Sequence, residues 1–385
     1  MKAFAEKLLL LLIGPLFLFL VCETGIRAYY LFAGFGSVSL ERQLAETEQA
    51  APAAGSNSGA TETTLGSIVR PSADPEMVYE LKPSISGTFQ NRPFTFNSHG
   101  MRDEEYPLKK GEATFRIAAI GDSVLFGWGV EQDHSYTAVA EKFLNDHSKD
   151  HQTAADPSGG PRYEILNFGI PGYNTTMEAA LLEKKAAQFD PDMILLHFVS
   201  NDWGVPLFMQ HTRNPWSFES SYFLDLIRSR LALTIGSKKC SEYFGDCSRF
   251  DRDDQQLALK QYAYMVGENG FRKAIRRIGE FARERKIPVV IVYGKATKRM
   301  EKRIEQIREQ WGFSEVRVKP YVDEYITRNG IQDNPKARHK AIAVSPFDNH
   351  PNSAGHRCYA EALLDHFAKM PEFGGVDFGP RPRVN

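Results

Sequence analysis

The chain has 385 residues, with 47 lysines and arginines against 48 aspartates and glutamates, and a formal net charge of −1. Hydrophobic residues make up 42% and charged residues 25%, an ordinary globular composition that excludes collagen-like, fully disordered and polytopic membrane proteins. The balanced charge argues against a nucleic-acid binder, and four cysteines are too few for a disulfide-stapled scaffold.

The N-terminus carries an unbroken apolar run from Leu8 to Cys22, preceded by Lys2 and Lys7. The run has the length of a signal-peptide core and is short for a membrane span, which usually needs about 17–25 residues. We favour a retained transmembrane anchor over residues 1–35, because no small-residue cleavage site follows the run and Arg27 can extend the span by snorkelling. A cleaved signal peptide is the alternative. With both lysines kept inside, the rest of the chain is expected to lie outside the cytoplasm.

Composition divides the remainder into three parts. Residues 36–70 are rich in small and polar residues and cannot bury enough surface to fold, so they predict a flexible linker. One folded domain is expected over residues 71–372, and residues 373–385 form an irregular tail.

A long insertion over residues 203–256 interrupts the domain and is rich in aromatic residues. It is predicted to be a lid or a specificity element, and a helical pair packed on the sheet is the alternative. Cys240 and Cys247 lie within it and are expected to pair in an oxidising compartment. Two free thiols are the other possibility.

Apolar runs alternate with amphipathic patterns along the domain. The expected strands are residues 115–120, 163–168, 193–199 and 287–293, and the expected helices are residues 135–147, 175–189, 271–282 and a last one after Asn352. Thr175 and Glu178 predict a T-x-x-E capping box at the start of the second helix. Such alternation implies a parallel sheet covered by helices on both faces, with ligands bound at the carboxyl ends of its strands.

Polar segments stand at those strand ends. They are Gly121-Asp122-Ser123 after the first strand, 167–172 after the second, Ser200-Asn201-Asp202 after the third, and 348–352 before the last helix. Together they supply a hydroxyl, an imidazole, a carboxylate, a carboxamide and glycine backbone at one edge of the sheet, a set sufficient for acyl transfer. Each segment alone is equally compatible with a turn or a cap. Their order after successive strands favours catalysis.

The roles follow from chemistry. Ser123 is the candidate nucleophile, His350 the base that takes its proton, and Asp348 the carboxylate that orients the imidazole. Asp348 and His350 are two apart, so in an extended segment their side chains leave the same face. The Asn201 carboxamide and the N–H groups of Gly172 and Ser123 are candidate donors to the oxyanion.

These segments resemble the blocks of a known family, the SGNH hydrolases or GDSL esterases and lipases, over roughly 96–370. The matching stretches are IGDSVLFGWGV, NFGIPGYNT, VSNDW and FDNHPNSAGH. The resemblance implies a flavodoxin-like three-layer α/β sandwich with a central parallel sheet, no metal, no cofactor, and the roles above for Ser123, His350, Asp348, Gly172 and Asn201. The lead-in FNSHGMRDEEYP is similar to that of membrane-anchored bacterial members, which implies an inner-membrane protein with a periplasmic catalytic domain.

The chain departs from the family pattern at three places. Val124 replaces the leucine of G-D-S-L, and Ser200 replaces a glycine of the third block, where loop geometry is expected to differ. The last block has D-x-H spacing in place of the commoner D-x-x-H, so the pairing of Asp348 with His350 depends on local geometry.

Several further residues have two interpretations. Trp128 and Tyr173 could line an acyl or sugar pocket or belong to the core, and Asp122 and Asp202 are expected to support their loops. Three other histidines, His134, His197 and His356, are interpreted as structural.

The sequence therefore predicts a membrane-tethered, extracytoplasmic serine esterase that hydrolyses acyl esters, including O-acetyl esters of envelope carbohydrate. Its expected partners are the ester or acetylated carbohydrate substrate and the membrane, with no nucleic acid. An O-acyltransferase acting on envelope polysaccharide and a catalytically inactive envelope scaffold are the alternatives.

Overall fold

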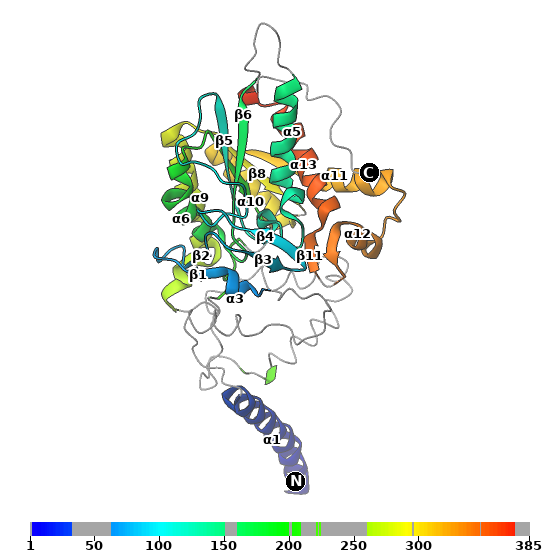
Figure 1. Ribbon diagram of the computed structural model, residues 1–385. Helices are drawn as coiled ribbons and strands as arrows, with labels where there is room; N and C mark the ends of the chain where they lie inside the picture. The colour runs from blue at the N-terminus through cyan, green and yellow to red at the C-terminus, as the bar shows by residue number, and fades with distance from the viewer. Residues whose placement is uncertain are drawn as a thin grey trace.

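The computed structural model describes residues 2–32, 63–150, 160–199, 202–208, 221, 223–224, 260–294, 296–346 and 348–373. A long N-terminal helix, α1 (Lys2–Phe32), projects from the folded domain (Figure 1). Within the described part of the chain, no helix is both long enough and apolar enough to cross a membrane, so the expected span over residues 1–35 stays a prediction.

A five-stranded parallel sheet forms the centre of the domain. Its strands are β5 (Thr114–Gly121), β6 (Arg162–Gly169), β7 (Met193–His197), β8 (Val289–Tyr293) and β9 (Ser314–Arg317). They lie in the order β6-β5-β7-β8-β9, and every neighbouring pair is parallel. Counted along the chain, this is the order 2-1-3-4-5 of flavodoxin-like sheets, with the switch point beside β5. The predicted α/β sandwich is confirmed in its central sheet.

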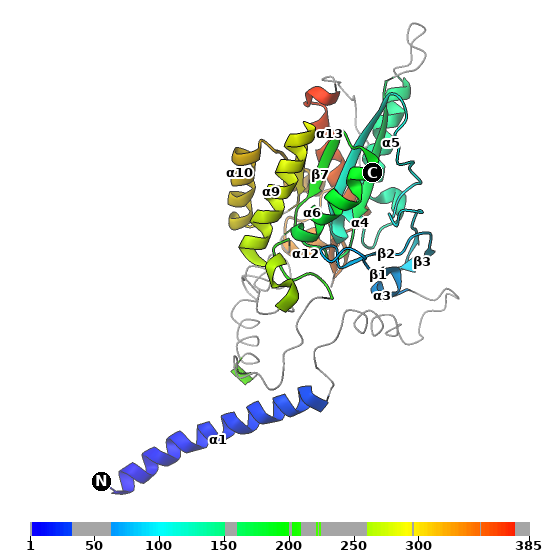
Figure 2. The same cartoon turned by 90° about the vertical axis from the view of Figure 1, so that its left-hand side faces the viewer.

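Helices cover both faces of this sheet (Figures 1 and 2). α6 (Thr175–Lys184) and α9 (Gly267–Arg285) pack on one face, and α5 (Tyr136–Asp150) and α13 (Ser353–Phe367) pack on the other. Side chains of β5 alternate between the two cores, because successive residues of a strand point to opposite faces. The other helices of the domain are α4 (Ser123–Phe126), α10 (Lys298–Trp311), α11 (Lys319–Arg328), α12 (Pro335–Ile342) and the 3₁₀ helices η1 (Gln132–His134), η2 (Ala186–Phe189), η5 (Lys260–Met265) and η6 (Pro371–Phe373).

Short elements precede the sheet and were not expected. They are α3 (Leu65–Ile68), the antiparallel pair β1 (Val69–Pro71) and β2 (Tyr79–Leu81), and the hairpin of β3 (Ser86–Phe89) with β4 (Arg92–Thr95). Ile68 is fully buried, so the folded domain begins before the predicted boundary at residue 71. Strands of three or four residues carry too few side chains to show a period of two, which is why the sequence pattern did not reveal them.

Two further expectations concern the cap of α6 and the segments outside the central sheet. The capping box of Thr175 and Glu178 is wrong: Asn174 is the cap of α6, and its side chain accepts hydrogen bonds from the Thr176 and Met177 N–H groups. The cap is the non-helical residue directly before a helix, and that residue is Asn174, whereas Thr175 is already the first residue of α6. The Cys240–Cys247 pair, most of the linker and most of the tail lie outside the described residues.

Candidate active site

Ser123 stands on a sharp turn at the carboxyl end of β5. Asp122 caps the short helix α4 by accepting a hydrogen bond from the Val124 N–H at 3.1 Å. Gly121 must be a glycine, because an added Cβ would lie 2.7 Å from the Cβ of His197. Ser123 is the first residue of α4, where a backbone N–H has no acceptor within the helix. The turn thus presents both the hydroxyl and the amide of one residue.

His350 and Asp348 come from β11 (Asp348–Pro351), which pairs antiparallel with β10 (Ala343–Ser345). The His350 Nε2 lies 2.8 Å from the Ser123 Oγ. On the other side of the imidazole, Nδ1 lies 2.6 Å from the Asp348 Oδ1, which also accepts a bond from the His350 backbone N–H at 2.9 Å. The D-x-H spacing therefore brings the two side chains into direct contact.

The Asp348 carboxylate is stabilised in its charged form. Burial works to raise its pKa, but hydrogen bonds from the His350 side chain and backbone, together with one from the Trp128 indole N–H at 2.9 Å, outweigh burial and lower the pKa to about 2. A carboxylate accepts only, so it selects the tautomer with the proton on His350 Nδ1. His350 Nε2 is then free to accept the proton of Ser123.

The Ser123 hydroxyl has two acceptors within reach. His350 Nε2 is at 2.8 Å and the Asp122 Oδ2 is at 3.2 Å. One hydroxyl carries one proton, and the shorter contact is the bond to His350. Asp122, which is buried, serves chiefly as the cap of α4.

Gly172 follows β6 with a φ of +81°, a conformation that favours glycine. An added Cβ would lie 2.4 Å from Cδ1 and 2.6 Å from Cβ of Leu207, whose N–H donates to the Gly172 carbonyl at 3.1 Å. Leu207 belongs to the insertion predicted over residues 203–256, so that insertion begins in contact with a candidate oxyanion residue.

Asn201, the other candidate oxyanion donor, lies outside the described residues, as does Ser200. The adjoining Asp202 is buried and accepts a hydrogen bond from the Val199 N–H at 3.0 Å. Its backbone carbonyl accepts a bond from the Thr175 N–H at 3.0 Å. These bonds tie the end of β7 to the start of α6, which supports the predicted role of Asp202 in holding its loop.

The structure also decides between the two interpretations of Tyr173, and it shows the surroundings of two histidines and of Trp128. Tyr173 is fully buried and its hydroxyl group donates to the Tyr79 carbonyl, with the Met77 carbonyl 3.0 Å away, so it belongs to the core. His197 and His356 are also fully buried, and burial lowers their pKa values to about 4 and about 3. Trp128 makes a contact that the sequence did not predict: its indole N–H donates to Asp348, 220 positions away, which no local pattern signals.

Within the described ranges, the group Glu131, Asp133 and His134 places potential metal ligands within 4.8 Å of one another. Glu131 already pairs with Arg92 at 3.3 Å, and Asp133 is exposed. This is an ordinary pattern for surface charges.

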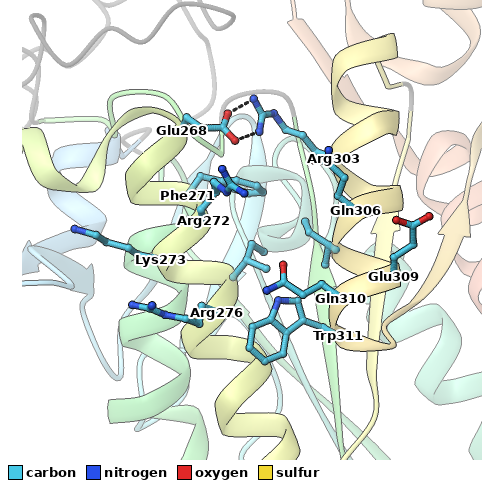
Figure 3. Close-up of a pocket in the computed structure, with 12 residues that line it drawn as sticks. Glu268, Phe271, Arg272, Lys273, Arg276, Arg303, Gln306, Glu309, Gln310 and Trp311 are labelled. Carbon is cyan, nitrogen blue, oxygen red and sulfur yellow. Dashed lines mark hydrogen bonds and ion pairs between the residues drawn. The ribbon is translucent and has the colours of Figure 1, made fainter.

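A surface groove of about 580 Å³ lies between α9 and α10 (Figure 3). Half of its lining residues are charged, including Arg272, Lys273 and Arg276, and Trp311 lies at one end. Ser123, His350 and Asp348 do not line it, so the groove and the candidate active site are separate features.

Residues 119–358 match the GDSL-like Lipase/Acylhydrolase family. No curated protein sequence matches the chain.

Among solved structures, a two-domain esterase active on acetylated mannans is 14% identical, with a TM-score of 0.37, over 70% of this chain. The chain spans about half of that protein, 52% of its length. A catalytic mutant of an acetylxylan esterase from Geobacillus stearothermophilus is 14% identical over 65% of this chain and 93% of its own, with a TM-score of 0.36. An α/β hydrolase from the metagenome of Lake Arreo, Spain, is 13% identical over 65% and 94%, with a TM-score of 0.37.

Proposed function

The chain belongs to the GDSL-like lipase/acylhydrolase family and is a hydrolase acting on ester bonds, and on that premise we propose that Ser123, His350 and Asp348 are its catalytic triad. One observation carries the proposal. Two short hydrogen bonds join the three side chains in sequence, 2.8 Å from Ser123 to His350 and 2.6 Å from His350 to Asp348. This is the arrangement that activates a serine hydroxyl.

The proposed reaction has two steps. Ser123 Oγ attacks the ester carbonyl carbon while His350 Nε2 takes the hydroxyl proton, and the resulting imidazolium is stabilised by Asp348. The tetrahedral intermediate collapses, the alcohol leaves with the proton returned by His350, and an acyl-enzyme remains. Water then attacks that acyl group with His350 as base, which releases the acid and restores Ser123.

Charge develops on the carbonyl oxygen in both steps. We propose that the N–H groups of Ser123 and Gly172 and the carboxamide of Asn201 stabilise it. The position of the Ser123 amide in the first turn of α4 and the positive φ of Gly172 support the first two donors. Each donor is expected to contribute about 10²–10³ in rate.

The proposed substrate is an acyl ester, with O-acetylated carbohydrate as the class to test first. The insertion over residues 203–256 is proposed to select among substrates. Its described start supports this, because Leu207 lies against the candidate oxyanion residue Gly172 and is 42% exposed.

We further propose that α1 tethers the domain to the bacterial inner membrane, with the catalytic domain in the periplasm. The described part of α1 exposes large apolar side chains to solvent, including Leu16, Phe17 and Leu18, each more than half exposed. Such a surface is unfavourable in water and suits lipid. The test is membrane fractionation with protease accessibility. Release of the full chain from the membrane by carbonate would contradict the tether. Protection of the domain from protease added to intact spheroplasts would contradict its periplasmic location.

Comparison of the full chain with Ser123→Ala tests the esterase function. We expect hydrolysis of short-chain p-nitrophenyl esters and acetylated sugars by the wild type, loss of at least 10³ in the variant, and labelling of Ser123 by a fluorophosphonate. Ser86→Ala, on the exposed face of β3, is the matched control and should leave the rate unchanged. Product analysis separates the alternatives: free acid supports hydrolysis, and an acylated sugar supports acyl transfer. A folded protein with neither activity nor labelling would support the scaffold.

A further inference from the structure

Both oxygens of the triad carboxylate have donors. Asp348 Oδ1 accepts the two bonds from His350, and Oδ2 accepts the Trp128 indole N–H at 2.9 Å. We propose that Trp128 is a positioning residue for catalysis, which fixes Asp348 and His350 in the geometry that activates Ser123. The inference rests on the proposed esterase function.

Trp128 holds the imidazole as well as the carboxylate. Its ring stacks on His350, with centroids 5.0 Å apart and planes inclined by 21°. A face-on contact limits rotation of His350 away from Ser123. The negative face of the indole also favours the imidazolium that forms when His350 takes the serine proton.

Trp128 is itself rigidly placed. Its ring packs edge-on against Phe89 at 4.9 Å, and its backbone N–H donates to the Ser123 carbonyl at 3.1 Å. The buried Arg102 guanidinium donates to the carbonyls of Gly127 at 2.5 Å and Val130 at 2.6 Å, on either side of the tryptophan. The short β3–β4 hairpin and the lead-in to β5 therefore support a side chain that in turn supports the triad.

The local sequence explains why this support matters. In the D-x-H spacing, Asp348 is held to His350 by one oxygen alone, and rotation about its χ2 angle would exchange the two oxygens. The indole N–H occupies the second oxygen and opposes that rotation, since a bond to a charged acceptor is stronger than a neutral one. Hydrogen bonds from His350 and Trp128 are also what keeps the Asp348 pKa near 2 in spite of burial.

Trp128→Phe tests the inference, because phenylalanine keeps a ring against His350 and Phe89 but has no N–H. We expect kcat to fall about tenfold, the typical loss for one bond to a charged group, while KM changes less than twofold. Trp311→Phe, a half-buried tryptophan of the separate α9–α10 groove, is the matched control and should retain wild-type kcat (Figure 3). A rise in KM with unchanged kcat would make Trp128 a substrate contact and overturn the proposal.

A double-mutant cycle isolates the route of action. If Trp128 acts through Asp348, Trp128→Phe should change kcat less than twofold in an Asp348→Asn background. The same tenfold loss in both backgrounds would overturn the proposal.

A readout independent of turnover separates this inference from the proposed function. The hydrogen-bonded Nδ1 proton of His350, observed by NMR, should exchange with solvent faster in Trp128→Phe than in the wild type. Equal exchange in both proteins overturns the positioning role whether or not the wild type hydrolyses esters. Absence of Ser123-dependent hydrolysis in the wild type refutes the proposed function alone.

Discussion

Replacing Asp348 with asparagine is expected to slow ester hydrolysis by about 10³. The ordinary pKa of an aspartate is 3.8, and in this site it is about 2. Because a tenfold change in proton affinity corresponds to about 1.4 kcal/mol, the site favours the charged carboxylate by about 2.5 kcal/mol. The side chains of Asp348 and His350 are 24% and 28% exposed, so we assign about 2 kcal/mol, or about thirtyfold in rate, to the loss of charge.

The second part of the loss comes from the tautomer. An asparagine at position 348 can turn its NH₂ group toward His350 Nδ1, which places the imidazole proton on Nε2. His350 could then no longer accept the proton of Ser123, 2.8 Å away. Together the two effects give about 10³ or more.

The assay is kcat and kcat/KM for a p-nitrophenyl ester at neutral pH, with folding checked by thermal unfolding. Asp333→Asn is the control, because Asp333 is a 79% exposed partner of Arg338 and makes no contact with Asp348. A loss smaller than tenfold in a folded Asp348→Asn protein would refute the assigned role.

The same substitution has a signature in stability. The folded-state pKa of Asp348 is lowered, so its ionised carboxylate stabilises the fold above about pH 3.8, and this contribution is lost as pH falls through 2. Wild type and Asp348→Asn should therefore differ most in unfolding free energy near neutral pH and converge in acid.

Two further predictions concern a backbone position and a buried acid. Gly172→Ala should lower kcat/KM at least tenfold, since the new methyl group would lie 2.4 Å from Leu207. The control is Gly312→Ala, because Gly312 has a similar φ of +73° and open space around it; this variant should lose some thermal stability and keep its kcat/KM. Equal activity in the two variants would contradict the steric argument. Burial raises the pKa of Glu141 from 4.5 to about 7, so the contribution of Glu141 to stability falls as pH rises from 4.5 to 7. Glutamine at this position can still accept the hydrogen bond from Tyr106 but cannot ionise. The unfolding free energy of Glu141→Gln, measured by chemical denaturation, should therefore rise relative to wild type by up to about 3 kcal/mol between pH 4 and pH 8. A pH-independent difference would show that Glu141 ionises normally.

The sequence predicted the centre of the fold because four of the five sheet strands are strongly apolar. β7 and β8 are buried at every position, and runs of that kind are typical of parallel strands. β9 was missed because Ser314–Arg317 is short and buries one of its four residues fully. An edge strand of this kind has the same local pattern as a loop.

The positions of the candidate catalytic side chains were predictable for a different reason. Ser123 and the segment from Asp348 to His350 stand where the topology of a parallel sheet places functional residues, and extended backbone at 348–350 sets both side chains to one side. The contact of Trp128 with Asp348 joins residues 220 positions apart and depends on the whole fold. Local pattern contains no information about such a contact.

The aspartates of the site show most clearly what sequence leaves undetermined. Asp348 begins β11 and Asp202 follows β7, and each lies within two residues of a candidate catalytic residue. The sequence predicted a triad role for Asp348 and a structural role for Asp202, but it did not predict the charge of either carboxylate. Asp348 is partly exposed and receives three hydrogen bonds, which hold its pKa at about 2 and keep it charged beside His350. Asp202 is buried, close to the buried Glu178, and one backbone N–H donates to its carboxylate, so desolvation and the neighbouring acid raise its pKa. In the proposed mechanism the same functional group thus serves as the anion that supports the imidazolium at Asp348 and as a structural hydrogen-bonding group at Asp202. What decides between the two is the burial, the neighbouring charges and the hydrogen-bond donors that the tertiary fold gives each carboxylate.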